Sequence, residues 1–351
     1  ILLETTDLPV TEVAYAAGFA SIRQFNDTVR EIYASTPTSL RRRSRHGRHA
    51  RDPVAGMIEL RLAHRRPADL TGVVSFLAAR AVPGVEEVEG RTYRRSLVLP
   101  HGVGIVELTP ADGYLHATLR LADPRDLSSA VARCRRLFDL DADSAAIDDV
   151  LATDPALAPL VQGVPGRRVP GAVDGDELAV RAVLGQQVSV AAARRLAGRL
   201  VVAYGKPLDA PLGGVTHTFP TAAVLAGADP SAFPMPVRRQ KTLHELAARL
   251  ADGRLHLDPG ADRAEIERQL AEIPGVGPWT AGYVRMRALT DPDVFLVGDL
   301  GIRHGLLRAG LPTESTAATT VAQAWRPWRS YAQMHLWALA ARHNDEEGTA
   351  P

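Results

Sequence analysis

The chain has 351 residues, of which 46% are hydrophobic, and its formal net charge at pH 7 is only +1. This length predicts two or more domains, and no apolar run is long enough to span a bilayer. A single cysteine, Cys134, excludes a disulfide framework and any four-cysteine zinc or iron-sulfur site within this sequence. We therefore expect a soluble, cytoplasmic protein without a membrane partner.

Two short helices are expected near the beginning of the chain. Residues 9–17 have apolar positions on one helical face, Gly18 marks the end of that helix, and Ser21 can cap a second helix over 22–33. This is helix-turn-helix spacing. The side chains available for a DNA groove are Arg23, Gln24, Asn26 and Arg30.

Residues 7–43 resemble the second helix-turn-helix of AraC-family regulators, and Thr36-Pro37 opens a third helix. Members of that family carry two such units. Because only one is present and the chain begins at Ile1, inside a helical pattern, we expect it to be a fragment of a longer protein. The basic run over residues 41–51 is predicted to be a linker that follows a phosphate backbone; the alternative is a solvated surface run.

Alternating apolar residues replace the helical pattern from Met57 onward. Strands are predicted at 58–62, 92–99, 103–108 and 114–121, with a hairpin at Asp112-Gly113, and helices at 70–81 and 127–138. Antiparallel strands with helices on one face form a small α+β domain. Cys134 is expected to be a small buried side chain of the second helix.

Helices separated by proline and glycine dominate the remainder, to about residue 342. The segment 173–200 reads as a helix interrupted at Gly185-Gln-Gln-Val-Ser189, where Ser189 can cap the continuation. Gln187 in this interruption is either a DNA-contacting residue or an ordinary capping or buried glutamine.

The sequence Ile273-Pro-Gly-Val-Gly-Pro278 is predicted to be a tight hairpin between two helices. Gly275 and Gly277 can take positive φ and leave backbone amides uncovered at the start of the second helix, which suits a phosphate. Such a contact would not depend on base identity. The alternative is an ordinary turn between two helices.

Asp299 follows the apolar run 294–297 and precedes a predicted helix over 300–308. It is a helix N-cap, a functional acid against an apolar wall, or both. Asp291 and Asp293 are neighbouring alternatives, but Pro292 between them indicates a turn.

The hairpin, Trp279-Thr-Ala and the acid at position 299 resemble the helix-hairpin-helix DNA glycosylases, and residues 57–342 resemble the AlkA type, 3-methyladenine DNA glycosylase II. The resemblance implies that Asp299 is the catalytic carboxylate and that Gln187 fills the gap left by an extruded nucleotide. It implies a base pocket of Trp279, Tyr283 and Trp337, although these aromatics could also be core residues. Ala338 stands where the best-known member has an aromatic residue, so the pocket could be more open. The bifunctional branch has a lysine where Trp279 stands, and that lysine forms the Schiff base that leads to strand cleavage. The resemblance therefore implies that this chain does not cleave the DNA strand.

We therefore expect a multidomain α+β protein with a partial helix-turn-helix (1–45), a basic linker (46–55), a small antiparallel α/β domain (56–135), an all-helical glycosylase domain (136–342) and a tail (343–351). The expected function is a monofunctional glycosylase that flips alkylated bases out of double-stranded DNA and excises them. No cofactor is expected. The resemblance allows a metal ion at the carbonyls of the hairpin, but no cluster of side-chain ligands in the sequence demands one. The fused helix-turn-helix would bind a specific operator, as in Ada-AlkA fusion proteins, and the nucleoid is the expected location. The alternative is a transcription regulator with a non-catalytic glycosylase-like clamp.

Overall fold

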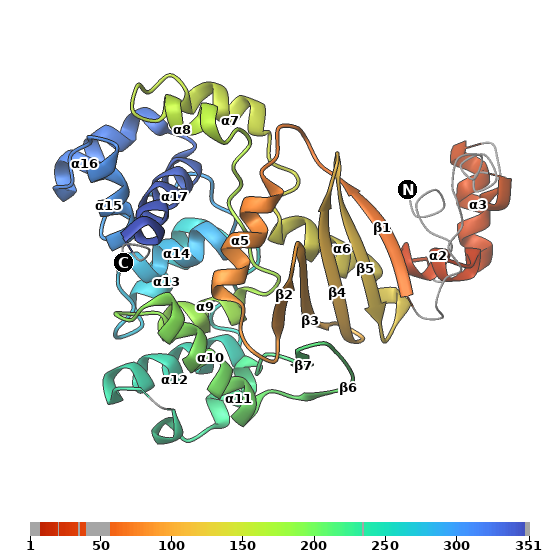
Figure 1. The fold of residues 1–351 in the computed structure, drawn as a ribbon. Helices are drawn as coiled ribbons and strands as arrows, with labels where there is room; N and C mark the ends of the chain where they lie inside the picture. Colours follow the sequence, from red (N-terminus) through yellow and green to blue (C-terminus); the bar gives the residue numbers. More distant parts are fainter. Residues whose placement is uncertain (1–7, 20, 34–35, 40–56, 234, 348–351) are drawn as a thin grey trace.

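The computed structural model describes residues 8–19, 21–33, 36–39, 57–233 and 235–347. A pair of helices, an antiparallel sheet with its own helices, and a larger helical part follow one another along the chain (Figure 1). The basic run 41–51 and most of the third helix expected after Pro37 lie outside the described residues. None of the helices in the described part combines the length and apolar character needed to cross a membrane.

The helix pair consists of α2 (Val10–Ala16) and α3 (Ile22–Tyr33). As predicted, Gly18 takes a positive φ of 83° at the turn, and Ser21 Oγ accepts a hydrogen bond from Gln24 N at 3.2 Å. A small apolar core that includes Val13 and Phe25 joins the two helices. The pair lies beside the sheet domain, where Ser128 Oγ donates to the carbonyl of Ala16 at 2.7 Å.

All five strands of the sheet pair antiparallel, in the order β1-β5-β4-β3-β2. Ile58, Leu60 and Leu62 of β1 are buried and alternate with exposed residues, so one face of the strand is turned to the core. The strands are β1 (Met57–Ala63), β2 (Glu86–Glu89), β3 (Thr92–Leu99), β4 (Gly102–Ala111) and β5 (Tyr114–Leu121). Helices α5 (Leu70–Arg80), η1 (Pro124–Asp126) and α6 (Leu127–Leu137) complete this part.

These elements confirm the four predicted strands, both predicted helices and the buried position of Cys134. Strand β2 was not predicted, because three of its four residues are glutamates, which strands seldom contain. One of them, Glu86, is buried and bound by arginines of other elements.

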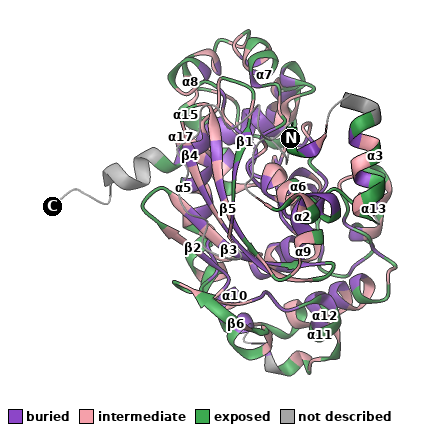
Figure 2. Ribbon diagram, turned by 90° about the vertical axis from the view of Figure 1, so that its right-hand side faces the viewer, coloured by how far each residue is buried: buried purple, intermediate pink, exposed green. Residues whose placement is uncertain are grey.

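The larger part is helical, and burial is highest where its helices face one another (Figure 2). Its first helices are α7 (Ser144–Leu151), α8 (Ala158–Gly163), α9 (Gly175–Leu184), α10 (Val190–Tyr204), α11 (Ala222–Gly227), η2 (Pro230–Ala232) and α12 (Val237–Ala251). The later ones are α13 (Arg263–Ala271), α14 (Pro278–Ala288), α15 (Leu300–Arg308), α16 (Ser315–Val321), η3 (Ala322–Trp325) and α17 (Arg329–Glu347). The predicted interruption after α9 is confirmed, and Ser189 caps α10 by accepting from Ala192 N at 3.2 Å.

A two-stranded hairpin within the helical part was not predicted. It consists of β6 (Pro207–Leu212) and β7 (Val215–His217). Two prolines in β6 conceal the alternation that identifies a strand. Gly84 pairs with Val215, so the hairpin lies against the sheet domain.

Three apolar cores meet where α5, α14 and α17 come together (Figure 1). Phe76 of α5 packs against both the sheet core and the core around α17. Tyr283 of α14 packs against both helical cores. Each of these two side chains is therefore held by two of the cores, which fixes its position.

Candidate active site

Asp299 is the N-cap residue of α15. Its Oδ1 accepts a hydrogen bond from Ile302 N at 2.9 Å, and its own backbone N–H donates to Leu296 O at 2.8 Å. The N-cap interpretation is thus confirmed. A helix N-terminus is also a favourable place for a negative charge, because the backbone amides point toward it.

Two indoles from different helices bind the carboxylate of Asp299. Trp279 Nε1, on α14, donates to Oδ2 at 2.8 Å, and Trp337 Nε1, on α17, donates to Oδ1 at 2.8 Å. An indole N–H can only donate, so both carboxylate oxygens serve as acceptors and the carboxylate plane is fixed. Both tryptophans remain partly exposed.

The alternative acids are engaged elsewhere. Asp291 forms an ion pair with Arg285 at 2.5 Å, and Asp293 forms one with Arg329 at 2.6 Å. These two carboxylates therefore fix the loop that precedes α15. Asp299 is the acid of this segment that faces aromatic side chains.

Aromatic rings surround this carboxylate. Trp279 and Tyr283 are stacked one helical turn apart, with centroids 5.2 Å apart and planes at 8°. Trp337 stacks on Phe76 at 6.4 Å and 30°. The structure thus brings together all three aromatics expected from the sequence and adds Phe76. Nothing in the apolar sequence of α5 distinguishes Phe76 from a core residue.

Two arginines that the sequence did not indicate, the buried Arg287 and the half-buried Arg80, lie against these rings. The guanidinium carbon of Arg80 is 3.7 Å from the centroid of Phe76, and that of Arg287 is 4.8 Å away. Arg287 also donates to the hydroxyl of Tyr283 at 2.7 Å. Burial alone would raise the pKa of Tyr283, but the charges of Arg287 and Arg80 outweigh it and hold that pKa below its usual value.

The predicted hairpin lies between α13 and α14. Gly275 takes a φ of 93°, and a side chain there would overlap Thr242 Oγ1, so glycine is required. The expectation of positive φ at Gly277 was wrong: its φ is −99°, because it is the N-cap residue of α14. No side chain caps α14, and a Cβ on Gly277 would meet no atom within 4 Å. The backbone amides in the first turn of α14 are therefore free to bind an anion.

The loop between α9 and α10 lies next to this hairpin. Gln187 is exposed and takes a φ of 57°, an unusual conformation for a residue with a side chain. The preceding residue, Gln186, donates from Nε2 to Gly275 O at 2.9 Å and to Thr280 Oγ1 at 3.0 Å. The sequence did not indicate that Gln186 would link the two loops.

The four predicted groove-contacting residues of α3 form the outer part of that helix. Arg23, Gln24 and Arg30 are exposed, and Asn26 is half-buried. Arg23 forms a loose ion pair with Asp27 at 3.9 Å.

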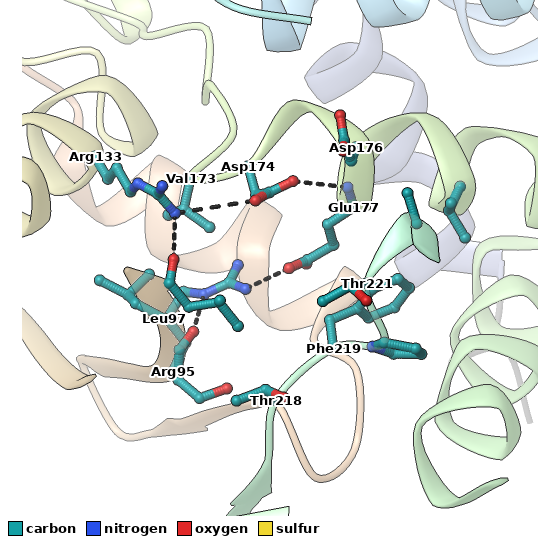
Figure 3. A pocket seen from close by; sticks show the side chains of 15 residues that line it. Arg95, Leu97, Arg133, Val173, Asp174, Asp176, Glu177, Thr218, Phe219 and Thr221 are labelled. Atoms are coloured by element: carbon teal, nitrogen blue, oxygen red, sulfur yellow. Dashed lines mark hydrogen bonds and ion pairs between the residues drawn. The ribbon is translucent and has the colours of Figure 1, made fainter. Parts of the chain in front are cut away.

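A cavity of about 120 Å³ lies at the seam between the sheet and α9, away from Asp299 (Figure 3). Three of its charged groups are already engaged: Arg95 binds Glu177 at 2.6 Å, and Asp174 caps α9. It is therefore part of the contact between the two halves. Among the described residues, no group of three or more His, Cys, Asp or Glu side chains could hold a metal ion.

Comparison with known proteins identifies two matching family domains. Residues 59–174 match the AlkA N-terminal domain, and residues 180–330 match the HhH-GPD superfamily of base excision DNA repair proteins. The chain is 52% identical, over 337 residues, to the probable bifunctional transcriptional activator/DNA repair enzyme AlkA of Mycobacterium tuberculosis, covering 96% of this chain and 68% of that protein. The chain belongs to the AlkA family of DNA glycosylases.

Two further proteins are similar to this chain. DNA-3-methyladenine glycosylase 2 of Escherichia coli is 36% identical over 286 residues, which are 80% of this chain and 97% of that enzyme. The 3-methyladenine DNA-glycosylase of Archaeoglobus fulgidus has the same fold, with a TM-score of 0.69, 20% identity, and coverage of 80% of this chain and 97% of that one. The two sequence relatives and the HhH-GPD match confirm the expected family and the expected type of enzyme, and the structural match shows the fold.

Proposed function

We propose that this AlkA-family chain removes alkylated purines such as 3-methyladenine from double-stranded DNA, with Asp299 as the catalytic carboxylate. The observation that carries the proposal is the position of Asp299, whose two oxygens are bound by Trp279 and Trp337 at 2.8 Å each. A fixed carboxylate beside aromatic walls suits a reaction in which positive charge develops on a sugar held against those walls.

The chemistry requires one acid. As the N-glycosidic bond breaks, the deoxyribose becomes cationic, and an ionised carboxylate near C1′ stabilises it and orients or deprotonates water. The indole N–H groups hold the carboxylate before the reaction, so little reorganisation is needed when the charge appears. An alkylated purine already carries a positive charge and leaves without a strong acid.

Trp279, Tyr283 and Trp337, together with Phe76, would form the walls of the base pocket. A cationic base is attracted to electron-rich aromatic faces. Because Arg80 and Arg287 already lie over Phe76, we assign the contact with the base to the indoles beside Asp299 rather than to that ring.

We assign the contacts with the DNA to Gly275 and Gly277 of the hairpin and to Gln187. The uncapped amides of α14 suit a backbone phosphate. A residue with a side chain in the left-handed region costs about 1–2 kcal/mol relative to an ordinary conformation. That Gln187 is not a glycine supports a function for its side chain, which would fill the space of the flipped nucleotide.

We further propose that α2 and α3 are an AraC-type helix-turn-helix that binds operator DNA through Arg23, Gln24, Asn26 and Arg30. The exposure of Arg23, Gln24 and Arg30 on α3 and the glycine turn at Gly18 support this. A protein that acts on chromosomal DNA would work in the cytoplasm, at the nucleoid.

The test uses methylated duplex DNA and measures the release of 3-methyladenine and 7-methylguanine. We expect release by the native chain without a strand break before alkali, since Trp279 occupies the position of the lyase lysine. D299N should lose roughly 10²- to 10³-fold in rate. Asparagine is itself a good N-cap, so this variant should keep its fold.

The matched control is D252N, the same change at a half-exposed aspartate that pairs with Arg254. It should release bases at the native rate. If neither the native chain nor D299N releases any base, the catalytic assignment is wrong, and the alternative of a non-catalytic DNA clamp is supported.

A further inference from the structure

Gln186 connects the two loops to which the proposed function assigns DNA contacts. Its Nε2 donates to Gly275 O of the hairpin at 2.9 Å and to Thr280 Oγ1 in the first turn of α14 at 3.0 Å. A carbonyl can only accept, so the bond to Gly275 fixes which end of the side-chain amide is NH₂. The neighbouring residue in the chain is Gln187.

The hairpin is held on its other side by α12. Thr242 Oγ1 donates to Pro274 O at 2.7 Å, and the Thr242 side chain leaves no space for a side chain on Gly275. Two consecutive carbonyls of the hairpin, those of Pro274 and Gly275, are thus bound by side chains of different segments. Of these two contacts, only the one from Gln186 leads to the α9–α10 loop.

The ends of the α9–α10 loop are also fixed. Gly185 is the C-cap of α9, and Ser189 caps α10 through Ala192 N at 3.2 Å. Between these ends, Gln187 takes its left-handed conformation and is exposed. The bond from Gln186 therefore determines where the backbone of Gln187 lies relative to the hairpin.

We propose that Gln186 is a positioning residue. It sets the distance between Gln187, the wedge that would fill the space of the flipped nucleotide, and the hairpin amides that would bind a phosphate. With this distance fixed, the side chain of Gln187 would enter the base stack at a fixed number of nucleotides from the phosphate that the hairpin binds. The inference rests on the proposed function, because that function supplies the parts played by Gln187 and the hairpin. A displacement of about 1 Å in such a device can cost up to about 10²-fold in rate.

Two substitutions of nearly the same shape test this. Q186M removes both donors, and Q186E places carboxylate oxygens against the Gly275 carbonyl. The matched control is Q240M. Gln240 Nε2 also donates to two acceptors, the carbonyls of Phe233 at 2.9 Å and Met235 at 3.0 Å, but it belongs to α12 and joins neither loop.

Four quantities are measured for each variant: the single-turnover excision rate at saturating enzyme, the fluorescence of 2-aminopurine placed beside the lesion, the Kd for a duplex with a tetrahydrofuran abasic analogue, and the melting temperature. We expect Q186M and Q186E to lower the rate about ten- to a hundredfold and to weaken the fluorescence rise that reports unstacking. Their Kd should stay within about threefold, because the hairpin still meets the phosphate. Q240M should lower the melting temperature about as much as Q186M without changing the rate.

Q187A separates this inference from the proposed function. If Q187A is slow while both Gln186 variants are as fast as the native chain, the positioning inference is overturned and the wedge stands. If Q187A excises at the native rate, the wedge assignment fails and the inference fails with it. If Q240M is slowed as much as Q186M, the effect is general destabilisation, and the inference is again overturned.

Discussion

The carboxyl group of Asp299 caps α15 and accepts hydrogen bonds from two indoles. The sequence predicted the cap from local spacing and the acid from the family resemblance. It could not predict that Trp279 and Trp337 would bind different oxygens, because these residues are separated by 58 positions and meet only in the folded chain.

W337F tests whether the indole N–H contributes beyond its ring. Phenylalanine keeps an aromatic wall but loses the donor to Oδ1. A hydrogen bond to a charged group is worth about 1.5–3 kcal/mol, which corresponds to a rate loss of roughly ten- to a hundredfold. We expect this loss in the single-turnover rate, with little change in DNA affinity. W328F, the same change at a tryptophan whose ring contacts Tyr331 edge-on, is the control and should be as active as the native chain.

The elements differ in how well the sequence predicts them. The helix before Gly18, the helix after Ser21 and the hairpin at Asp112-Gly113 were predicted because their signals are local caps and turns. Strand β2 was missed because it is rich in glutamate, and the partner that allows Glu86 to be buried, Arg95, lies on another strand. Phe76 and Gln186 were missed for the same reason: their partners are distant in sequence.

The two hairpin glycines allow a paired test at the level of the α13–α14 hairpin. G275A places a side chain at positive φ and against Thr242, so we expect a loss of about 2 kcal/mol or more in unfolding free energy and weaker binding to any duplex. G277A has ordinary φ and open space, so its stability should stay within about 0.5 kcal/mol of the native chain. Urea unfolding and DNA titration measure both. Equal stability of the two variants would contradict this account of the hairpin.

At the scale of the whole molecule, buried charges join the sheet domain to the helical part (Figure 3). Arg181 of α9 binds Glu86 at 2.9 Å and Glu177 at 2.8 Å, and it donates to the carbonyl of Arg80 at 2.7 Å. Burial alone would raise the pKa of Glu86, but Arg181 and Arg95 hold it below its usual value. Since Arg80 ends α5, this network also fixes the helix that carries Phe76.

R181M should therefore destabilise the chain by about 3–5 kcal/mol, because it leaves two buried carboxylates short of a partner. R254M removes an exposed ion pair with Asp252, which solvent screens, and should leave the free energy of unfolding nearly unchanged. Thermal unfolding distinguishes the two. A small effect of R181M would mean that the contact between the sheet domain and the helical part is not stabilised by this network.

Asp176 lines the cavity between the sheet and α9, and it should make the free energy of unfolding depend on pH. Burial, with repulsion from Asp174 and Asp258, raises the pKa of Asp176 from 3.8 to about 6. The folded state therefore keeps the proton up to about pH 6, whereas the unfolded chain releases it near pH 4. Above pH 6 the ionised Asp176 therefore lowers the free energy of unfolding, and this loss of stability disappears as the pH falls from 6 to 4.

D176N should accordingly be more stable than the native chain at pH 7.5 by about 1–2 kcal/mol, a reduced figure because the side chain is partly solvated. The difference should shrink as the pH falls to 4. Urea unfolding across this range measures it, with D209N, at an exposed aspartate, as the control. A difference that stays constant with pH would show that the charge of Asp176 is not its source.

The most direct measurement of the central claim compares two abasic-site analogues in the same duplex. A pyrrolidine ring with a protonated nitrogen at the position of C1′ mimics the cationic sugar, and tetrahydrofuran is its neutral counterpart. If the Asp299 carboxylate faces the cationic centre, the native chain should bind the charged ring at least about tenfold more tightly, and D299N should bind both rings equally. Full retention of the preference in D299N would contradict the account.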